Sequence, residues 1–231
     1  AHRRVTFCSA AKVASTTTKQ YFFDIAEGFV TIPEGARYGV HEANWQRLAQ
    51  VEPAARRFIL KSPDWTHVFF WKHVVERFVS GYLDKVVHDC GNNEVITPNL
   101  AISFYNQFGF SCEKHTDFEA FIGFMETVPK YEGHFHSQTP LCSIGKYPVT
   151  DSIKADEHLD SRLEELSKKL GAEHPPKQEK TKKHSTDAKS KMVNLLKGRP
   201  DLVGRIVDMF HEDCEKIPEA CDVKDLLAAI A

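Results

Sequence analysis

Small and hydroxyl-bearing residues around one lysine form the first group that could carry chemistry. Residues 10–17 read AAKVASTT and follow a short β-prone run, Val5 to Ser9. A turn that leaves a strand and opens a helix directs backbone N–H groups and the positive helix end at one spot, which suits phosphate or sulfate. Lys12 and the hydroxyls of Ser15, Thr16 and Thr17 would add donors. The alternative is an ordinary capped helix that carries a surface lysine.

This turn lacks the pattern of an ATP-binding loop. The signature GxxxxGK[ST] is absent, and residues 1–27 contain no glycine. No aspartate is an obvious magnesium ligand either. A kinase that uses ATP is therefore disfavoured.

The second candidate is the segment WKHVVERFVSGYLDK at residues 71–85. Lys72 follows a predicted buried strand over Thr66 to Trp71, and Arg77 and Ser80 are three residues apart on the next helix. Lysine, arginine and serine beyond the carboxyl end of a strand make a second anion site where open α/β sheets bind ligands. A solvated helix face is the competing interpretation.

The elements that must position these residues follow from hydrophobic periodicity. A strand, a turn, a helix, and then another buried strand and helix make the βαβ pattern, which predicts an α/β fold with a small parallel sheet and many helices. The spacing of apolar residues predicts helices over 16–28, 44–60 (interrupted near Pro53), 74–88, 99–108, 117–128, 156–170, 188–197, 201–216 and 223–230.

Composition places the chain among globular proteins. Its 231 residues are 42% hydrophobic and 27% charged, with 30 basic and 32 acidic side chains and a net charge of −2. A general nucleic-acid binder would be strongly basic, so no nucleic-acid partner is expected and an anionic ligand must be held by a local patch. No apolar run approaches the roughly 18 residues of a membrane span.

Six cysteines, Cys8, Cys90, Cys112, Cys142, Cys214 and Cys221, show no CxxC pair and no zinc-type spacing. No metal site is therefore expected. An even count allows up to three disulfides in an oxidising compartment, with about 15 pairings among which the sequence does not choose. Buried free thiols in a cytosolic protein are the alternative.

One stretch departs from the rest in composition. Residues 173–191 hold two prolines and six lysines, which favours a solvated linker or a mobile loop.

Read together, the two candidate segments resemble the carbohydrate sulfotransferases of the Golgi lumen, the branch with the chondroitin and dermatan enzymes. AAKVASTTTK is similar to the family's 5′-phosphosulfate loop, and WKHVVERFVSGYLDK to its 3′-phosphate element. Four further segments resemble family motifs in the same order, over about Val5 to Ile217: GHFHSQTPLC, IGKYPVTDSIKAD, KHSTDAKSK and LVGRIVDMFHEDCEKI.

The resemblance implies a single sulfotransferase domain over residues 1–231, with a P-loop-like sulfotransferase fold. It implies the sulfuryl donor PAPS (3′-phosphoadenosine 5′-phosphosulfate), the product PAP, a carbohydrate acceptor and no metal. The 5′-phosphosulfate would be held by Lys12, Val13, Ala14, Ser15, Thr16 and Thr17, and the 3′-phosphate by Lys72, Arg77 and Ser80. His184, Ser185 and Thr186 would belong to a loop that closes over the cofactor within residues 173–191.

The resemblance also suggests the catalytic groups. Lys12 would neutralise the leaving phosphate, and His41 would be the base that takes the acceptor's proton, with its neighbour Glu42 in reserve. His134 and His136 are expected to bind the acceptor sugar.

The chain departs from the family pattern in several places. Lys72 stands where the family has arginine, and it lacks the planar fork that grips two phosphate oxygens. His73 and Val74 replace an acid and a proline, and Ala11, Phe135 and Pro148 replace a proline, a tryptophan and a glutamate. A non-catalytic relative that binds a glycan or PAP is therefore the alternative function.

The family and the cysteines together predict a location in the Golgi lumen or a secreted form. In the Golgi the protein would be a type II membrane protein whose anchor lies upstream of Ala1. The sequence does not indicate the oligomeric state.

Overall fold

The computed structural model describes residues 4–25, 51–91, 105–128, 133–172 and 185–231. The chain divides into two compact units. The first unit contains residues 1–71 and 142–180, and the second contains residues 72–141 and 181–231. The expectation of one domain over the whole chain stays a prediction.

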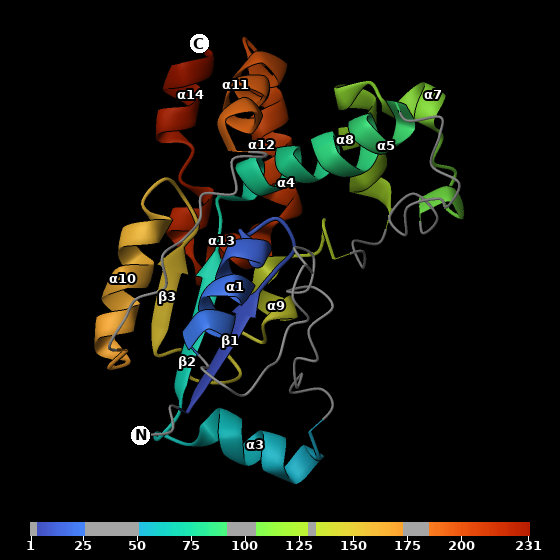
Figure 1. Cartoon of the computed structure of the whole chain (residues 1–231). Helices are drawn as coiled ribbons and strands as arrows, with labels where there is room; N and C mark the ends of the chain where they lie inside the picture. The colour runs from blue at the N-terminus through green and yellow to red at the C-terminus, as the bar shows by residue number, and fades with distance from the viewer. Residues whose placement is uncertain (1–3, 26–50, 92–104, 129–132, 173–184) are drawn as a thin grey trace. The chain divides into compact units, whose positions relative to one another are not determined.

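The first unit is built on a parallel sheet of the strands β1 (Val5–Ser9), β2 (Thr66–Trp71) and β3 (Asp151–Lys154), in the order β1-β2-β3 (Figure 1). β1 and β2 lie where β-branched and aromatic residues predicted them, whereas β3 was not foreseen. β3 has only one buried residue, Ile153, so its sequence carries little strand signal. The predicted α/β class with a small parallel sheet is confirmed.

Two helices cover one face of this sheet, α1 (Ser15–Ile25) and α10 (Leu159–Lys169). Their apolar residues join strand residues in one core cluster: Ala10, Val13, Tyr21, Phe22, Val68, Phe70, Ile153, Ala155, Leu159, Leu163 and Leu166. Across this cluster the Tyr21 hydroxyl lies 2.8 Å from Ser167 Oγ. Each large apolar side chain buried here contributes about 1.5–3 kcal/mol.

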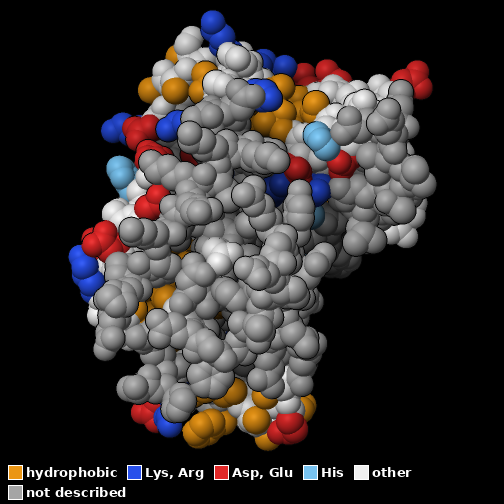
Figure 2. Space-filling view, viewed as in Figure 1, with side chains coloured by type: hydrophobic (Ala, Val, Ile, Leu, Met, Phe, Trp, Pro, Cys, Tyr) orange, Lys and Arg blue, Asp and Glu red, His pale blue; other side chains and the backbone are white. Residues whose placement is uncertain are grey.

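A third helix of the first unit, α3 (Pro53–Lys61), buries no residue. Pro53 stands in the first turn, where proline is favoured, and the Glu52 carboxylate accepts the first free N–H groups. The predicted helix over 44–60 is therefore described only from Pro53 onward. Phe58 is 68% exposed, and hydrophobic side chains are visible at this helix in Figure 2.

The second unit begins with a continuous helical stretch of three parts. α4 (Val74–Tyr82) passes into a π-helical turn, η2 (Leu83–Val87), and then into α5 (His88–Gly91). The prediction of a helix over 74–88 is confirmed, although the periodicity gave no sign of the π turn. Two helices follow, α7 (Cys112–His115) and α8 (Phe118–Thr127).

Phe78 on α4 is the centre of the second unit's core. Its ring lies 5.6–6.2 Å from the rings of Phe118, Phe121, Phe135 and Phe210. Gly81 allows this packing, because a Cβ there would lie 2.9 Å from Cε1 of Phe135.

The remaining elements of the second unit are α9 (Gln138–Leu141), α11 (Ser185–Leu196), α12 (Pro200–Met209), α13 (His211–Lys216), the 3₁₀ turn η3 (Pro218–Cys221) and α14 (Lys224–Ile230). The predicted helix over 201–216 is broken at Phe210, whose ring enters the core. The expected loop over 173–191 is too long by seven residues, because 185–191 are the first turns of α11; residues 173–184 lie outside the described part.

All six cysteines are paired, as Cys8–Cys142, Cys90–Cys112 and Cys214–Cys221. The disulfide interpretation is confirmed, and it indicates a non-cytosolic compartment. Within the described ranges, no helix has the length and apolar character needed to cross a bilayer.

Candidate functional site

The loop between β1 and α1 is anchored at two buried residues. Ala10 and Val13 are both 0% exposed, and the Val13 N–H donates to the Ala10 carbonyl at 3.3 Å. Ser9 Oγ donates to the Val13 carbonyl at 2.9 Å and closes the loop from the strand side. The loop is therefore fixed by the core beneath it.

Two non-glycine residues of this loop have left-handed backbone conformations. Lys12 has φ 65° and Ala14 has φ 47°, and Val13 between them does not. A left-handed conformation costs an L-residue roughly 1–2 kcal/mol. Alternating handedness is a backbone arrangement that directs successive N–H groups into an anion-binding concavity. The loop reaches this conformation without glycine, which explains why the sequence carries no glycine-rich signature.

The first turn of α1 suits an anion as well. It contains no acidic residue, and its threonine and serine side chains range from exposed Thr16 to half-buried Ser15 and Thr17. Thr18 is buried, and its hydroxyl donates to the Ser15 carbonyl at 3.2 Å. The six residues predicted to hold the 5′-phosphosulfate thus form one continuous loop and helix start within the first unit.

Lys72 directly follows β2 and is half-buried in the second unit. Its Nζ lies 3.8 Å from a carboxylate oxygen of Glu76, one turn into α4. The lysine that was predicted to hold the 3′-phosphate therefore has an acidic neighbour.

Arg77 does not lie on a solvated helix face, which was the competing interpretation of this segment. It is 1% exposed, and its Nη2 donates to the Gly133 carbonyl at 3.0 Å. Ser80, three residues on, is half-buried. Arg77 is buried because the apolar face of α4 is wider than the periodicity indicated and also contains Val74 and Gly81.

His73 begins α4 in place of the family's acidic residue. Its Nδ1 accepts the Val75 N–H at 3.3 Å, so Nε2 carries the ring hydrogen and donates to the Asp222 carbonyl at 3.1 Å. A neutral histidine thus caps the helix as an acidic side chain would.

The backbone of Lys72 is held by Gln138. The Lys72 N–H donates to Gln138 Oε1 and the Gln138 amide donates to the Lys72 carbonyl, both at 2.9 Å. Gln138 is in turn held by Asp213, whose Oδ2 accepts the Gln138 N–H at 2.9 Å. Both side chains are 0% exposed.

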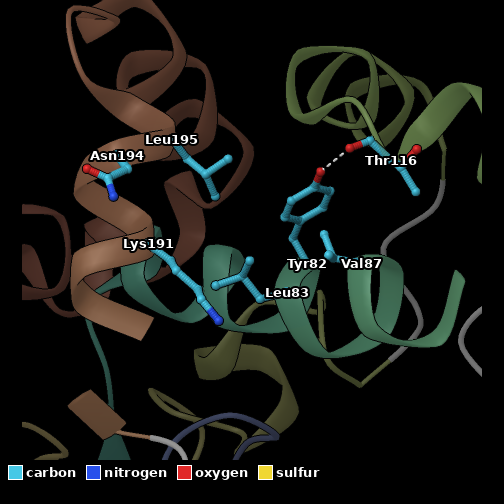
Figure 3. Close-up of a pocket in the computed structure, with 7 residues that line it drawn as sticks. All are labelled: Tyr82, Leu83, Val87, Thr116, Lys191, Asn194 and Leu195. Carbon is cyan, nitrogen blue, oxygen red and sulfur yellow. Dashed lines mark hydrogen bonds between the residues drawn. The ribbon is translucent and has the colours of Figure 1, made fainter. Parts of the chain in front are cut away.

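A pocket of about 420 Å³, open to solvent, lies beside the end of α4. Its lining residues are Tyr82, Leu83, Val87, Thr116, Lys191, Asn194 and Leu195, and Figure 3 shows Lys191 and Leu195 of α11 on the side of Tyr82 and Leu83. The Tyr82 hydroxyl donates to the Thr116 carbonyl. Burial raises the pKa of Tyr82 to about 12, and the nearby Asp117 carboxylate contributes to this rise, so the phenol stays neutral.

The two histidines predicted to bind the acceptor flank a core residue. His134 and His136 are half-buried on either side of Phe135, which is 0% exposed. The His136 Nδ1 lies 3.0 Å from the Ser137 carbonyl, which accepts its hydrogen. Phe135, which stands where the family pattern has tryptophan, therefore anchors the segment between the two histidines in the core.

Three of the predicted site residues, His41, Glu42 and His184, lie outside the described residues. Ser185 and Thr186 are the first residues of α11. The described residues contain no group of three or more metal-ligating side chains placed to hold an ion.

Prediction from sequence missed the contributions of Gln138, Asp213 and His73. Both Gln138 and Asp213 lie in segments that resemble family motifs, so the signal was present in GHFHSQTPLC and in LVGRIVDMFHEDCEKI. It gave no partner for either residue, because their contact joins positions 75 residues apart.

The chain was compared with known proteins and families. No curated protein and no solved structure gave a significant match. The family description that matches is that of the sulfotransferase family, and it covers residues 1–216, nearly the whole length. With its parallel sheet and its left-handed strand-to-helix loop, the chain belongs to the sulfotransferase family.

Proposed function

We propose that this sulfotransferase transfers a sulfuryl group from PAPS to a hydroxyl of a carbohydrate acceptor. The observation that carries the proposal is the loop over residues 10–17, in which Lys12 and Ala14 are left-handed, since such a backbone suits an anion. PAPS would supply the reactive sulfuryl group and a 3′-phosphate.

Lys12 to Thr17 would orient the 5′ end of the donor. Backbone N–H groups at the start of α1 and the Lys12 ammonium would stabilise the charge that develops on the leaving phosphate. In-line transfer requires chiefly that the reacting groups be positioned and that the developing negative charge be stabilised. The burial of Ala10 and Val13, which anchors the loop, supports this role.

Lys72, Arg77 and Ser80 would bind the 3′-phosphate, and His184, Ser185 and Thr186 would cover the cofactor. His41 would accept the proton of the acceptor hydroxyl, with Glu42 as the reserve base. His134 and His136 would contact the acceptor. The three disulfides support a secretory location, either the Golgi lumen, as an anchored type II protein, or the exterior after secretion.

Binding of PAP, measured by calorimetry, tests the cofactor assignment. The wild type is compared with Lys12→Ala and Lys72→Ala, and Lys197→Ala serves as a control because Lys197 is exposed at the end of α11. We expect the first two variants to bind PAP more weakly and the control to match the wild type. A wild type that does not bind PAP would refute the assignment.

A second function, glycan or PAP binding without transfer, is favoured by Lys72, which stands where the family pattern has arginine and whose Nζ lies 3.8 Å from the Glu76 carboxylate. An acidic neighbour offsets part of the charge that a phosphate needs. Incubation with ³⁵S-labelled PAPS and a panel of glycans separates the two functions, since transfer to any one glycan rules out the non-catalytic one.

A further inference from the structure

Asp213 is an ionisable side chain in the interior of the second unit, 0% exposed. Four donors surround its carboxylate. Oδ1 accepts the Thr139 N–H and the Thr139 hydroxyl, both at 2.8 Å, and Oδ2 accepts the Gln138 N–H at 2.9 Å and the Gln138 amide at 3.4 Å. A buried carboxylate is costly unless it is hydrogen-bonded in this way. The carboxylate therefore fixes the start of α9 and the Gln138 side chain together.

Gln138 connects Asp213 to the turn between β2 and α4. Its side-chain amide pairs with both the N–H and the carbonyl of Lys72 at 2.9 Å, as a neighbouring strand would. A primary amide matches this pair of groups because it carries one acceptor and one donor side by side. The backbone at Lys72 is thus set by a side chain 66 residues away.

The same turn has a second anchor at the next residue. His73 donates to the Asp222 carbonyl at 3.1 Å. Asp213 precedes Cys214 and Asp222 follows Cys221, so the two anchors flank a single disulfide. The segment from Asp213 to Asp222 holds both residues of the turn.

We propose that Asp213 is a positioning residue for recognition of the 3′-phosphate, acting through Gln138 on Lys72. The proposal rests on the proposed function, since it takes Lys72 as part of the 3′-phosphate site. Its specific content is that Asp213 and Gln138 act on one end of the cofactor only.

The test compares two nucleotides that differ in the 3′-phosphate alone, adenosine 3′,5′-bisphosphate and adenosine 5′-monophosphate. In Gln138→Met the two bonds to Lys72 are lost while side-chain size is kept. We expect affinity for the bisphosphate to fall about three- to tenfold, the effect of roughly one hydrogen bond, with affinity for the monophosphate unchanged. Asp213→Asn should likewise lower the affinity for the bisphosphate relative to the affinity for the monophosphate. Gln107→Met and Asp208→Asn, at exposed positions of the second unit, are the matched controls.

Hydrogen exchange at the Lys72 amide gives a readout that needs no ligand. We expect faster exchange in Gln138→Met than in the wild type, with the α8 amides unchanged, so a variant that merely unfolds is recognised. An equal loss of affinity for both nucleotides, or an unchanged Lys72 amide, overturns the proposal. A wild type that binds neither nucleotide overturns the proposed function and the cofactor role with it, and the exchange rate then still decides whether Gln138 positions Lys72.

Discussion

The Cys8–Cys142 disulfide should contribute more to the free energy of unfolding than the Cys214–Cys221 disulfide. The perturbation is a pair of double variants, Cys8→Ala with Cys142→Ala, and Cys214→Ala with Cys221→Ala. The first bond joins residues 134 apart in sequence and the second joins residues only 7 apart. A cross-link restricts the unfolded chain more when it closes a longer loop.

The chain-entropy relation gives the magnitudes. A loop of 134 residues corresponds to about 5 kcal/mol at 25 °C, and a loop of 7 residues to about 2.4 kcal/mol. Cys90–Cys112 lies inside the long loop and shortens it by 22 residues, which lowers the first value only to about 4.8 kcal/mol because the dependence is logarithmic. The expected difference between the two double variants is therefore about 2.5 kcal/mol.

Urea unfolding followed by circular dichroism measures this difference. Mass mapping without reductant first verifies that the two remaining bonds are intact in each variant. A Cys214/Cys221 variant that loses as much stability as the Cys8/Cys142 variant would refute the loop-entropy reasoning. It would show that local packing at the short bond outweighs the restriction of the unfolded chain.

Three further predictions follow from single residues. Ala14→Gly should be about 1–2 kcal/mol less destabilising than the helical control Ala120→Gly in urea unfolding, because only Ala14 has φ above zero; equal losses would contradict this. Burial lowers the pKa of His67, with a Ser62 backbone bond acting in the opposite direction, so the folded state binds fewer protons than the unfolded state. The contribution of His67 to the free energy of unfolding should therefore be complete above about pH 6.5 and be lost as the pH falls toward the pKa of the folded state. His67→Gln should flatten the dependence of the free energy of unfolding on pH in this range; an unchanged slope would count against this role of His67. Tyr82→Phe should remove a tyrosine that ionises near pH 12 from the ultraviolet titration and cost about 1 kcal/mol through the lost bond to Thr116.

Local patterns predicted the elements whose residues carry strong signals of their own. β1 and β2 have runs of β-branched and aromatic residues, and α10 repeats leucines at helical spacing, so these elements lie close to where the sequence indicated. β3 was missed because a strand of four residues with one buried side chain differs little from a loop. The burial of Arg77 was missed because a charged residue on a helix is read as solvated until its neighbours are known.

The residues of the candidate site could be predicted from the sequence, but their conformations and contacts could not. The segment AAKVASTT indicated an anion loop, yet its left-handed residues are lysine and alanine, types that give no sign of such a conformation. Asp213 and Gln138 depend on contacts across more than sixty residues of sequence, and no local pattern encodes those partners.

The division of the chain into two units also has a consequence for how the protein is made. Each unit is assembled from two stretches of sequence, and the stretches alternate, so neither unit is complete when the ribosome has finished its first stretch. β1 and β2 are synthesised before residues 72–141 and β3 after them, and residues 72–141 must in turn wait for α11 to α14. The nascent sheet therefore keeps β2 as an open edge throughout the synthesis of residues 72–150, which places its period of greatest exposure to aggregation before release of the chain rather than after it.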